Sequence, residues 1–265
     1  MPILEKLQPQ AVFAQFEQLC AIPHGSGNTK AISDYLVRFA AARGLRHIQD
    51  AHNNVVIFCP GTPGYEAAAP VILQGHMDMV CETAPDCAKD MTSEGLDLFV
   101  DGDTIGARGT TLGGDDGIAV AMALAILDAD DIPHPPLEVV LTVDEETGML
   151  GADALDASVL QGRTMLNLDS EDEGILTVSC AGGNVSVCTL PVTRAAFPGT
   201  ALTVTVGDLL GGHSGAEIDK GRGNANLLMG RVLYAISERT PLRLVSVAGG
   251  LKDNAIPRES RAVIA

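Results

Sequence analysis

The run VILQGHMD at residues 71–78 decides the fold, because it joins a buried strand to a polar end. Residues 71–73 are consecutive apolar residues, a pattern typical of a strand covered on both faces. His76 and Asp78 follow two residues apart, and alternate residues of an extended chain point to the same side. The run therefore predicts a central strand that delivers an imidazole and a carboxylate to one place.

Strand and helix patterns alternate on both sides of this run. A helix with apolar residues at helical spacing is predicted from the N-cap candidates Asn28 and Thr29 to a stop at Gly44. The other predicted elements are strands at 45–49, 55–59, 137–143 and 164–168, an Asp-Gly hairpin over 99–105 and an apolar helix at 118–128. This alternation predicts an α/β fold, a three-layer αβα domain around a mostly parallel sheet. Ligand groups then gather at the carboxyl ends of the strands.

The pattern changes beyond about Thr189. Alternating strands at 202–206, 242–247 and 261–264 surround one helix at 224–238, which predicts a second, α+β domain. We expect residues 1–188 to form the first domain and residues 189–265 the start of the second. Because the sequence stops at Ala265 within an apolar alternation, we expect a fragment in which both domains are incomplete.

Charge and composition exclude several classes of partner. The sequence has 34 acidic and 17 basic residues and a formal net charge of −17, which would repel phosphate backbones and anionic lipids. We therefore expect no nucleic-acid and no membrane partner. The start lacks a secretory signal pattern, and the 6 cysteines include no Cys-x-x-Cys pair, so a cytoplasmic protein with reduced thiols is expected.

Two further segments place adjacent acids beside predicted elements. Asp115 and Asp116 lie in a glycine-rich run before the apolar helix, where the backbone can approach a ligand, although helix capping is the alternative. Glu145 and Glu146 follow a strand, and neighbouring acids repel unless a cation or solvent separates them. One of the two could bind a metal while the other, with a raised pKa, moves protons.

Asp169 ends another predicted strand. The run from Asp169 to Gly174 matches the start of a calcium loop, but Cys180 occupies the position of the last calcium ligand, so an EF-hand is excluded. Four segments thus converge on one predicted metal site, whose candidate ligands are His76, one of Asp115 and Asp116, one of Glu145 and Glu146, and Asp169. Such a donor set suits paired Zn²⁺, Mn²⁺ or Co²⁺ with a bridging carboxylate. Serine-hydrolase and nucleotide-binding motifs are absent from the sequence.

Taken together, the motifs resemble the aminoacyl-histidine dipeptidases (peptidase D), a family of di-zinc exopeptidases. The resemblance covers essentially the whole sequence, and its motifs are GHMD at 75–78, ARGTTLGGDDG at 107–117, DEETG at 144–148, LDSE at 168–171, SCAGG at 179–183, GGHSG at 211–215 and NAIPRE at 254–259. It implies hydrolysis of dipeptides, especially Xaa-His dipeptides, with two divalent ions. Zn²⁺ is the expected metal, with Co²⁺ or Mn²⁺ as alternatives.

The resemblance also implies roles for individual residues in the first domain. His76 and Asp169 would bind one ion, Glu146 would help to bind the other, and Asp115 would bridge them. Asp78 would orient His76, and the peptide bond between Asp115 and Asp116 would be cis. Glu145 would be the general base that takes a proton from the metal-bridging water and passes it to the leaving amine.

In the second domain the resemblance implies a lid that also forms a homodimer. His213 would stabilise the oxyanion, typically in the site of the partner subunit, while Asn254 and Arg258 would grip the dipeptide substrate. A turn asparagine and a surface arginine are the alternatives for these two residues. The family's remaining metal ligand is a histidine near the end of a longer chain, and no histidine follows His213 here. An inactive metal-binding fragment and a related aminopeptidase or deacylase therefore stay open as alternative functions.

Overall fold

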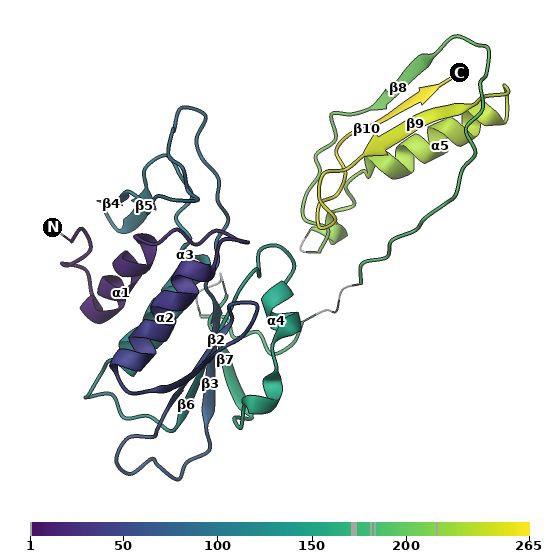
Figure 1. The fold of residues 1–265 in the computed structure, drawn as a ribbon. Helices are drawn as coiled ribbons and strands as arrows, with labels where there is room; N and C mark the ends of the chain where they lie inside the picture. The colour runs from purple at the N-terminus through teal and green to yellow at the C-terminus, as the bar shows by residue number, and fades with distance from the viewer. Residues whose placement is uncertain (1, 171–173, 181, 183, 216) are drawn as a thin grey trace. The chain divides into compact units, whose positions relative to one another are not determined.

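The computed structural model describes residues 2–265 apart from 171–173, 181, 183 and 216. The chain divides into two compact units, Met1–Ile175 and Leu176–Ala265, each with its own sheet (Figure 1). Within the described residues, none of the helices has the length and apolar character needed to cross a membrane.

The first unit contains a five-stranded sheet with the strand order β1-β2-β6-β3-β7. The elements of this unit are α1 (Gln10–Cys20), α2 (Lys30–Ala42), β1 (Arg46–Gln49), β2 (Val55–Cys59), β3 (Val71–His76), β4 (Leu98–Asp101), β5 (Thr104–Ala107), α3 (Gly114–Leu127), β6 (Leu137–Thr142), α4 (Leu150–Ala154), the 3₁₀ helix η1 (Ala157–Val159) and β7 (Thr164–Asn167). The α/β class predicted from the sequence is confirmed.

The sheet is mixed, and its parallel part carries the polar strand ends. β3 runs parallel to β6 and to β7, whereas β1 pairs antiparallel with β2 and β2 pairs antiparallel with β6. The described sheet therefore has fewer parallel strand pairs than the predicted, mostly parallel sheet. A tight turn at Asn53, with φ of 75°, folds β2 back on β1 and makes this pair antiparallel. Since His76 pairs in register with Thr142, the segments that follow β3 and β6 leave the sheet at the same edge.

Both faces of the central strands of the sheet are covered by apolar side chains, whereas the edge strand β7 is exposed. On one face Ile57 and Val139 belong to a large buried cluster that includes Leu36 of α2 and Leu124 of α3. On the other face a smaller cluster lies under the segment from α4 to η1; its buried members are Val56, Phe58, Ile72 and Val140. Alternate residues of β2 thus point to opposite faces, as the pleat of a strand requires.

The second unit is a three-stranded antiparallel sheet with one helix. Its elements are β8 (Leu202–Val206), the 3₁₀ helix η2 (Ile218–Lys220), α5 (Ala225–Ser237), β9 (Leu244–Gly249) and β10 (Ser260–Ile264), with the strand order β8-β10-β9. Asn224 caps α5 by accepting hydrogen bonds from the backbone N–H groups of Asn226 and Leu227. Met229 on α5 and Ala262 on β10 are buried, so the helix packs against the central strand.

Most predicted elements are present with ends shifted by a few residues. Two helices, α1 and α4, were not predicted, although α1 has buried residues at helical spacing, Phe16, Leu19 and Cys20. Helix α3 begins at Gly114, four residues before the predicted start at Ile118. Its first turn is irregular, because Asp115 and Asp116 have non-helical backbone angles. Those two aspartates lie next to the sheet edge where the polar residues gather.

Candidate metal centre

His76 is the last residue of β3 and is buried. Its Nδ1 lies 2.9 Å from the backbone oxygen of Asp78 and 3.4 Å from Oδ1 of the same residue. Its Nε2 points the other way and lies 2.9 Å from Oδ1 of Asp115. Asp78 therefore contacts the imidazole through both its carbonyl and its carboxylate, which leaves Nε2 directed at the acidic cluster.

Asp115 and Asp116 lie at the start of α3 and are joined by a cis peptide bond, as the resemblance implied. Their side chains have different partners. The carboxylate of Asp115 is exposed on one side and faces His76, whereas Asp116 is buried and its Oδ2 accepts a hydrogen bond of 3.0 Å from the backbone N–H of His76. A Cβ atom at Gly75 would lie 2.5 Å from that Oδ2, so only glycine leaves room for Asp116.

Glu145 and Glu146 follow β6 at the same edge. The backbone N–H of Glu145 donates a 3.1 Å hydrogen bond to Oδ1 of Asp78, and its Oε2 lies 4.0 Å from Nε2 of His76. Asp144, immediately before them, has a positive φ of 55° that turns the chain at the strand end. Because Asp78 holds the Glu145 backbone, the two acids are fixed against the end of β3.

The side chains form two groups that could each hold a metal ion. In one group, ligand atoms of His76, Asp115 and Glu146 lie within 4.8 Å of one another, and in the other, those of Asp115, Asp116 and Asp169 do. Asp115 is common to both groups. His76 is grouped with Glu146, whereas the resemblance paired it with Asp169, so the division of ligands between two ions stays a prediction. Glu171, part of the LDSE motif, lies outside the described residues.

Mutual repulsion and burial shift the pKa values of the cluster. Burial disfavours the imidazolium of His76, but Asp78, Asp116 and Asp115 outweigh this effect and raise its pKa to about 10. Burial raises the pKa of Asp116 to about 7, with Asp169 and Asp115 adding to the rise. Burial also raises the pKa values of Glu145 and Glu146, each of which has other carboxylates nearby. Divalent cations would relieve this repulsion, and imidazole with carboxylate oxygens is a donor set that Zn²⁺ accepts.

Three of the predicted site residues lie in the second unit. His213 forms an isolated antiparallel bridge with Ala255, which brings it beside Asn254, whose backbone oxygen accepts a 2.8 Å hydrogen bond from Ser214. Arg258 donates from Nε to the backbone oxygen of Leu209 at 3.0 Å. His213 and Asn254 are thus neighbours within this unit.

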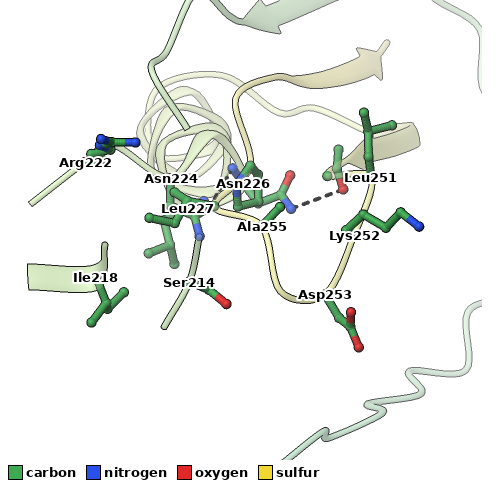
Figure 2. A pocket seen from close by; sticks show the side chains of 14 residues that line it. Ser214, Ile218, Arg222, Asn224, Asn226, Leu227, Leu251, Lys252, Asp253 and Ala255 are labelled. Carbon is green, nitrogen blue, oxygen red and sulfur yellow. Dashed lines mark hydrogen bonds between the residues drawn. The ribbon is translucent and has the colours of Figure 1, made fainter. Parts of the chain in front are cut away.

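A pocket of about 640 Å³ opens next to this bridge. Figure 2 shows that loop 251–255 and the start of α5 contribute lining side chains, among them Lys252 and Asn224, and that Ser214 adds another from a separate segment. The asparagine amide of Asn226 donates to the backbone oxygen of Gly249 at 3.2 Å and ties α5 to the end of β9. The pocket therefore combines amide, hydroxyl and ammonium groups that can bind a polar ligand.

Residues 24–27 also contact the acidic cluster, which was not predicted. The hydroxyl of Ser26 donates to Asp78 and the backbone N–H of Gly27 donates to Asp144. A serine followed by glycine before a helix reads as an ordinary turn, so the sequence carries no pattern that indicates this contact.

An α/β domain with a histidine and clustered carboxylates at the ends of parallel strands is an arrangement that metal-dependent hydrolases use. The chain belongs to peptidase family M20/M25/M40, whose sequence model matches residues 72–226. A second model, the peptidase dimerisation domain, matches residues 204–265. The resemblance to a metallopeptidase family inferred from the motifs is confirmed.

Individual relatives agree with this assignment. The chain is 42% identical over 267 residues to the cytosol non-specific dipeptidase of Escherichia coli (strain K12), covering 100% of this chain and 55% of that protein. It is 27% identical over 203 residues to an uncharacterised protein of Bacillus subtilis (strain 168), covering 73% of this chain and 47% of the relative. The chain therefore spans about half the length of the curated relatives it matches.

Solved structures give the same picture of the fold. The aminoacylhistidine dipeptidase of Vibrio alginolyticus superimposes with a TM-score of 0.72 at 38% identity, covering 98% of this chain and 54% of that structure. The aminopeptidase PepT of Bacillus cereus superimposes with a TM-score of 0.56 at 18% identity over 97% of this chain and 66% of that structure, a likeness that concerns the fold alone.

Proposed function

We propose that the protein hydrolyses dipeptides with the help of two divalent metal ions. The observation that supports this most is the shared position of Asp115, whose carboxylate belongs to both groups of potential ligands. A carboxylate between two ions is the usual arrangement of two-metal hydrolases, in which the ions lie about 3.5–4 Å apart. The residues that would hold the ions are His76, Asp115, Glu146 and Asp169.

The donor chemistry fits the proposed cofactor. One imidazole with several carboxylates suits Zn²⁺, with Co²⁺ or Mn²⁺ as alternatives. When bound, such ions polarise a peptide carbonyl and make water easier to deprotonate. The backbone carbonyl of Asp78 lies 2.9 Å from Nδ1 of His76 and engages this nitrogen, so Nε2 stays available as a metal ligand.

Glu145 is the proposed general base. Its carboxylate lies 4.0 Å from Nε2 of His76, beside the proposed ligands, and it is only partly buried. Burial and the neighbouring carboxylates raise its pKa, which suits a group that must accept a proton from water and then release it to the leaving amine. The hydrogen bond from the Glu145 backbone N–H to Asp78 fixes the backbone position from which the Glu145 side chain extends.

The second unit is proposed to bind the substrate and a second copy of the chain. Residues 1–188 would form the catalytic domain and residues 189–265 part of a lid and dimerisation domain. The match of the dimerisation model to 204–265 supports a homodimer. His213 would stabilise the oxyanion and Asn254 and Arg258 would hold the peptide, and the adjacency of His213 and Asn254 supports a joint role.

The names of two relatives guide the proposed substrates. One is described as a cytosol non-specific dipeptidase and another as an aminoacylhistidine dipeptidase. We infer unblocked dipeptides as the substrate class, with Xaa-His dipeptides favoured, and a cytoplasmic location. The second candidate function is a metal-binding protein without peptidase activity.

Metal content and hydrolysis measured together separate these candidates. Purified protein loaded with Zn²⁺, Co²⁺ or Mn²⁺ is assayed against β-alanyl-histidine, glycyl-histidine and dialanine, with Glu145→Gln as the test variant and Glu66→Gln as a control far from the cluster. Peptidase function predicts hydrolysis that Glu145→Gln abolishes and Glu66→Gln leaves intact. Bound metal without hydrolysis of any dipeptide would favour the second candidate, and absence of bound metal would overturn both.

A further inference from the structure

The turn at residues 24–28 pairs with the segment just beyond β3. The backbone N–H of Met79 donates to the oxygen of His24 and the N–H of Ser26 donates to the oxygen of Met79, both at 3.2 Å. Gly25 and Met79 thereby form a short parallel bridge. These hydrogen bonds place the side chain of residue 26 opposite Asp78, which is the residue before Met79.

Ser26 makes a direct contact with the carboxylate of Asp78, whose backbone oxygen lies 2.9 Å from Nδ1 of His76. Its hydroxyl donates to Oδ2 of Asp78 at 2.8 Å. The other oxygen, Oδ1, accepts the 3.1 Å hydrogen bond from the Glu145 backbone and lies 3.4 Å from Nδ1 of His76. Asp78 is buried, so its carboxylate depends on these donors rather than on bulk water. With Oδ2 held by Ser26, the plane of the carboxylate is set, and with it the position of Oδ1.

The same turn reaches a second carboxylate. The backbone N–H of Gly27 donates to Oδ1 of Asp144 at 2.6 Å, and Asp144 immediately precedes Glu145. The Asn28 amide donates to the backbone oxygen of Thr92 at 3.0 Å, which anchors the turn on its outer side. The turn thus holds the segment after β3 through Ser26 and the segment after β6 through Gly27.

We propose that Ser26 is a positioning residue of the metal centre, which acts through Asp78. By fixing Oδ2 it holds residue 78, whose carbonyl contacts Nδ1 of His76 and whose Oδ1 accepts the hydrogen bond from the Glu145 backbone. This proposal rests on the proposed metal-dependent function. It concerns a residue outside the matched range of the family model, which begins at residue 72.

The test compares Ser26→Ala with Ser26→Thr, which keeps the hydroxyl, in the full chain. Ser93→Ala is the control for the loss of a serine-to-aspartate hydrogen bond, because the Ser93 hydroxyl donates to Oδ2 of Asp90 at the same 2.8 Å, at an exposed position outside both groups of potential ligands. The readouts are the dissociation constant for Co²⁺ from its visible absorption, the melting temperature of chelator-treated protein, and kcat and KM for a dipeptide.

We expect Ser26→Ala to weaken Co²⁺ binding by about 10-fold or more, the usual effect of losing a group that supports a metal ligand. kcat should fall while KM changes little, Ser26→Thr should restore binding, and Ser93→Ala should bind as the wild type does. Ser26→Ala that binds Co²⁺ like the wild type would overturn the positioning role but leave the proposed function standing. A loss of melting temperature equal in Ser26→Ala and Ser26→Thr, with equal loss of binding, would point to a merely structural role. Wild-type protein that binds no Co²⁺ would overturn both proposals.

Discussion

Nε2 of His76 lies 2.9 Å from Oδ1 of Asp115, although the two residues are 39 positions apart in the chain. The contact joins the end of β3 to the irregular first turn of α3. Asp116 reinforces it from the neighbouring position, because its carboxylate accepts the backbone N–H of His76. Of these two adjacent aspartates, Asp116 thus holds the backbone of His76 and Asp115 faces its side chain.

Because Asp115 and Asp116 make different contacts, substitutions of the two residues should have different effects. Asp115→Ala should lower the occupancy of both ions, because its carboxylate belongs to both groups of ligands. Asp116→Asn should keep more metal but destabilise the fold by about 1–3 kcal/mol, the usual cost of disturbing a buried hydrogen-bonded group. Metal analysis and thermal unfolding of the two variants check this. Full metal retention in Asp115→Ala would refute the bridging assignment.

Glu145→Gln should lower the rate of hydrolysis without lowering the metal content. The amide cannot accept a proton from water, so kcat should fall by about 10²–10⁴-fold while metal content stays near the wild-type level. Steady-state kinetics with metal analysis of the same preparation measure both quantities. A variant that keeps wild-type kcat would remove Glu145 from the role of general base.

The raised pKa of His76 predicts how the metal-free protein responds to pH. Since its pKa rises from 6.5 to about 10 on folding, the stabilisation is fully present below pH 6.5 and is lost as the pH rises towards 10. The pKa of Asp116 also rises on folding, from 3.8 to about 7, so its contribution to stability is likewise lost as the pH rises, but between pH 3.8 and 7. The melting temperature of chelator-treated protein should therefore fall by several degrees between pH 6.5 and 9.5, given about 2–4 °C per kcal/mol. His76→Gln should flatten this dependence, and an unchanged slope in that variant would contradict it.

Gly75→Ala tests the close approach of α3 to β3. The new methyl group would lie 2.5 Å from Oδ2 of Asp116 and 3.1 Å from the Ala119 side chain, so the aspartate must move and the metal centre should be disturbed. We expect lower metal affinity and a loss of stability of about 1–3 kcal/mol. Gly230→Ala in α5 is the control, because a methyl group there has nothing within 4 Å and alanine favours a helix. Equal metal affinity and stability in Gly75→Ala and the wild type would show that the contact is unimportant.

The sequence alone predicts the strands and the positions of the acids well, for physical reasons. β3 could be predicted because a short apolar run followed by alternating polar residues is typical of a buried strand that ends at a site. The pair Asp115-Asp116 could be predicted because glycines lie on both sides of it. Helix α1 was missed although its apolar spacing is regular. The antiparallel pairing of β1 and β2 was not anticipated, because pairing direction depends on the turn at Asn53 rather than on strand composition.

Contacts between distant segments were beyond sequence reasoning. Ser26 lies 52 positions from Asp78, and no periodicity or motif joins them. The grouping of His76 with Glu146, rather than with Asp169, likewise has no local pattern in the sequence that indicates it. Local patterns report which residues are polar and which elements carry them, whereas the partner of each side chain is decided by the packing of the whole unit.

The most direct measurement of the proposed centre is anomalous diffraction at the zinc absorption edge from crystals grown with Zn²⁺. Two anomalous peaks about 3.5–4 Å apart are predicted, with the carboxylate of Asp115 between them and His76 beside one of them. A single peak away from Asp115, or no peak among His76, Asp115, Glu146 and Asp169, would contradict the proposed two-metal site.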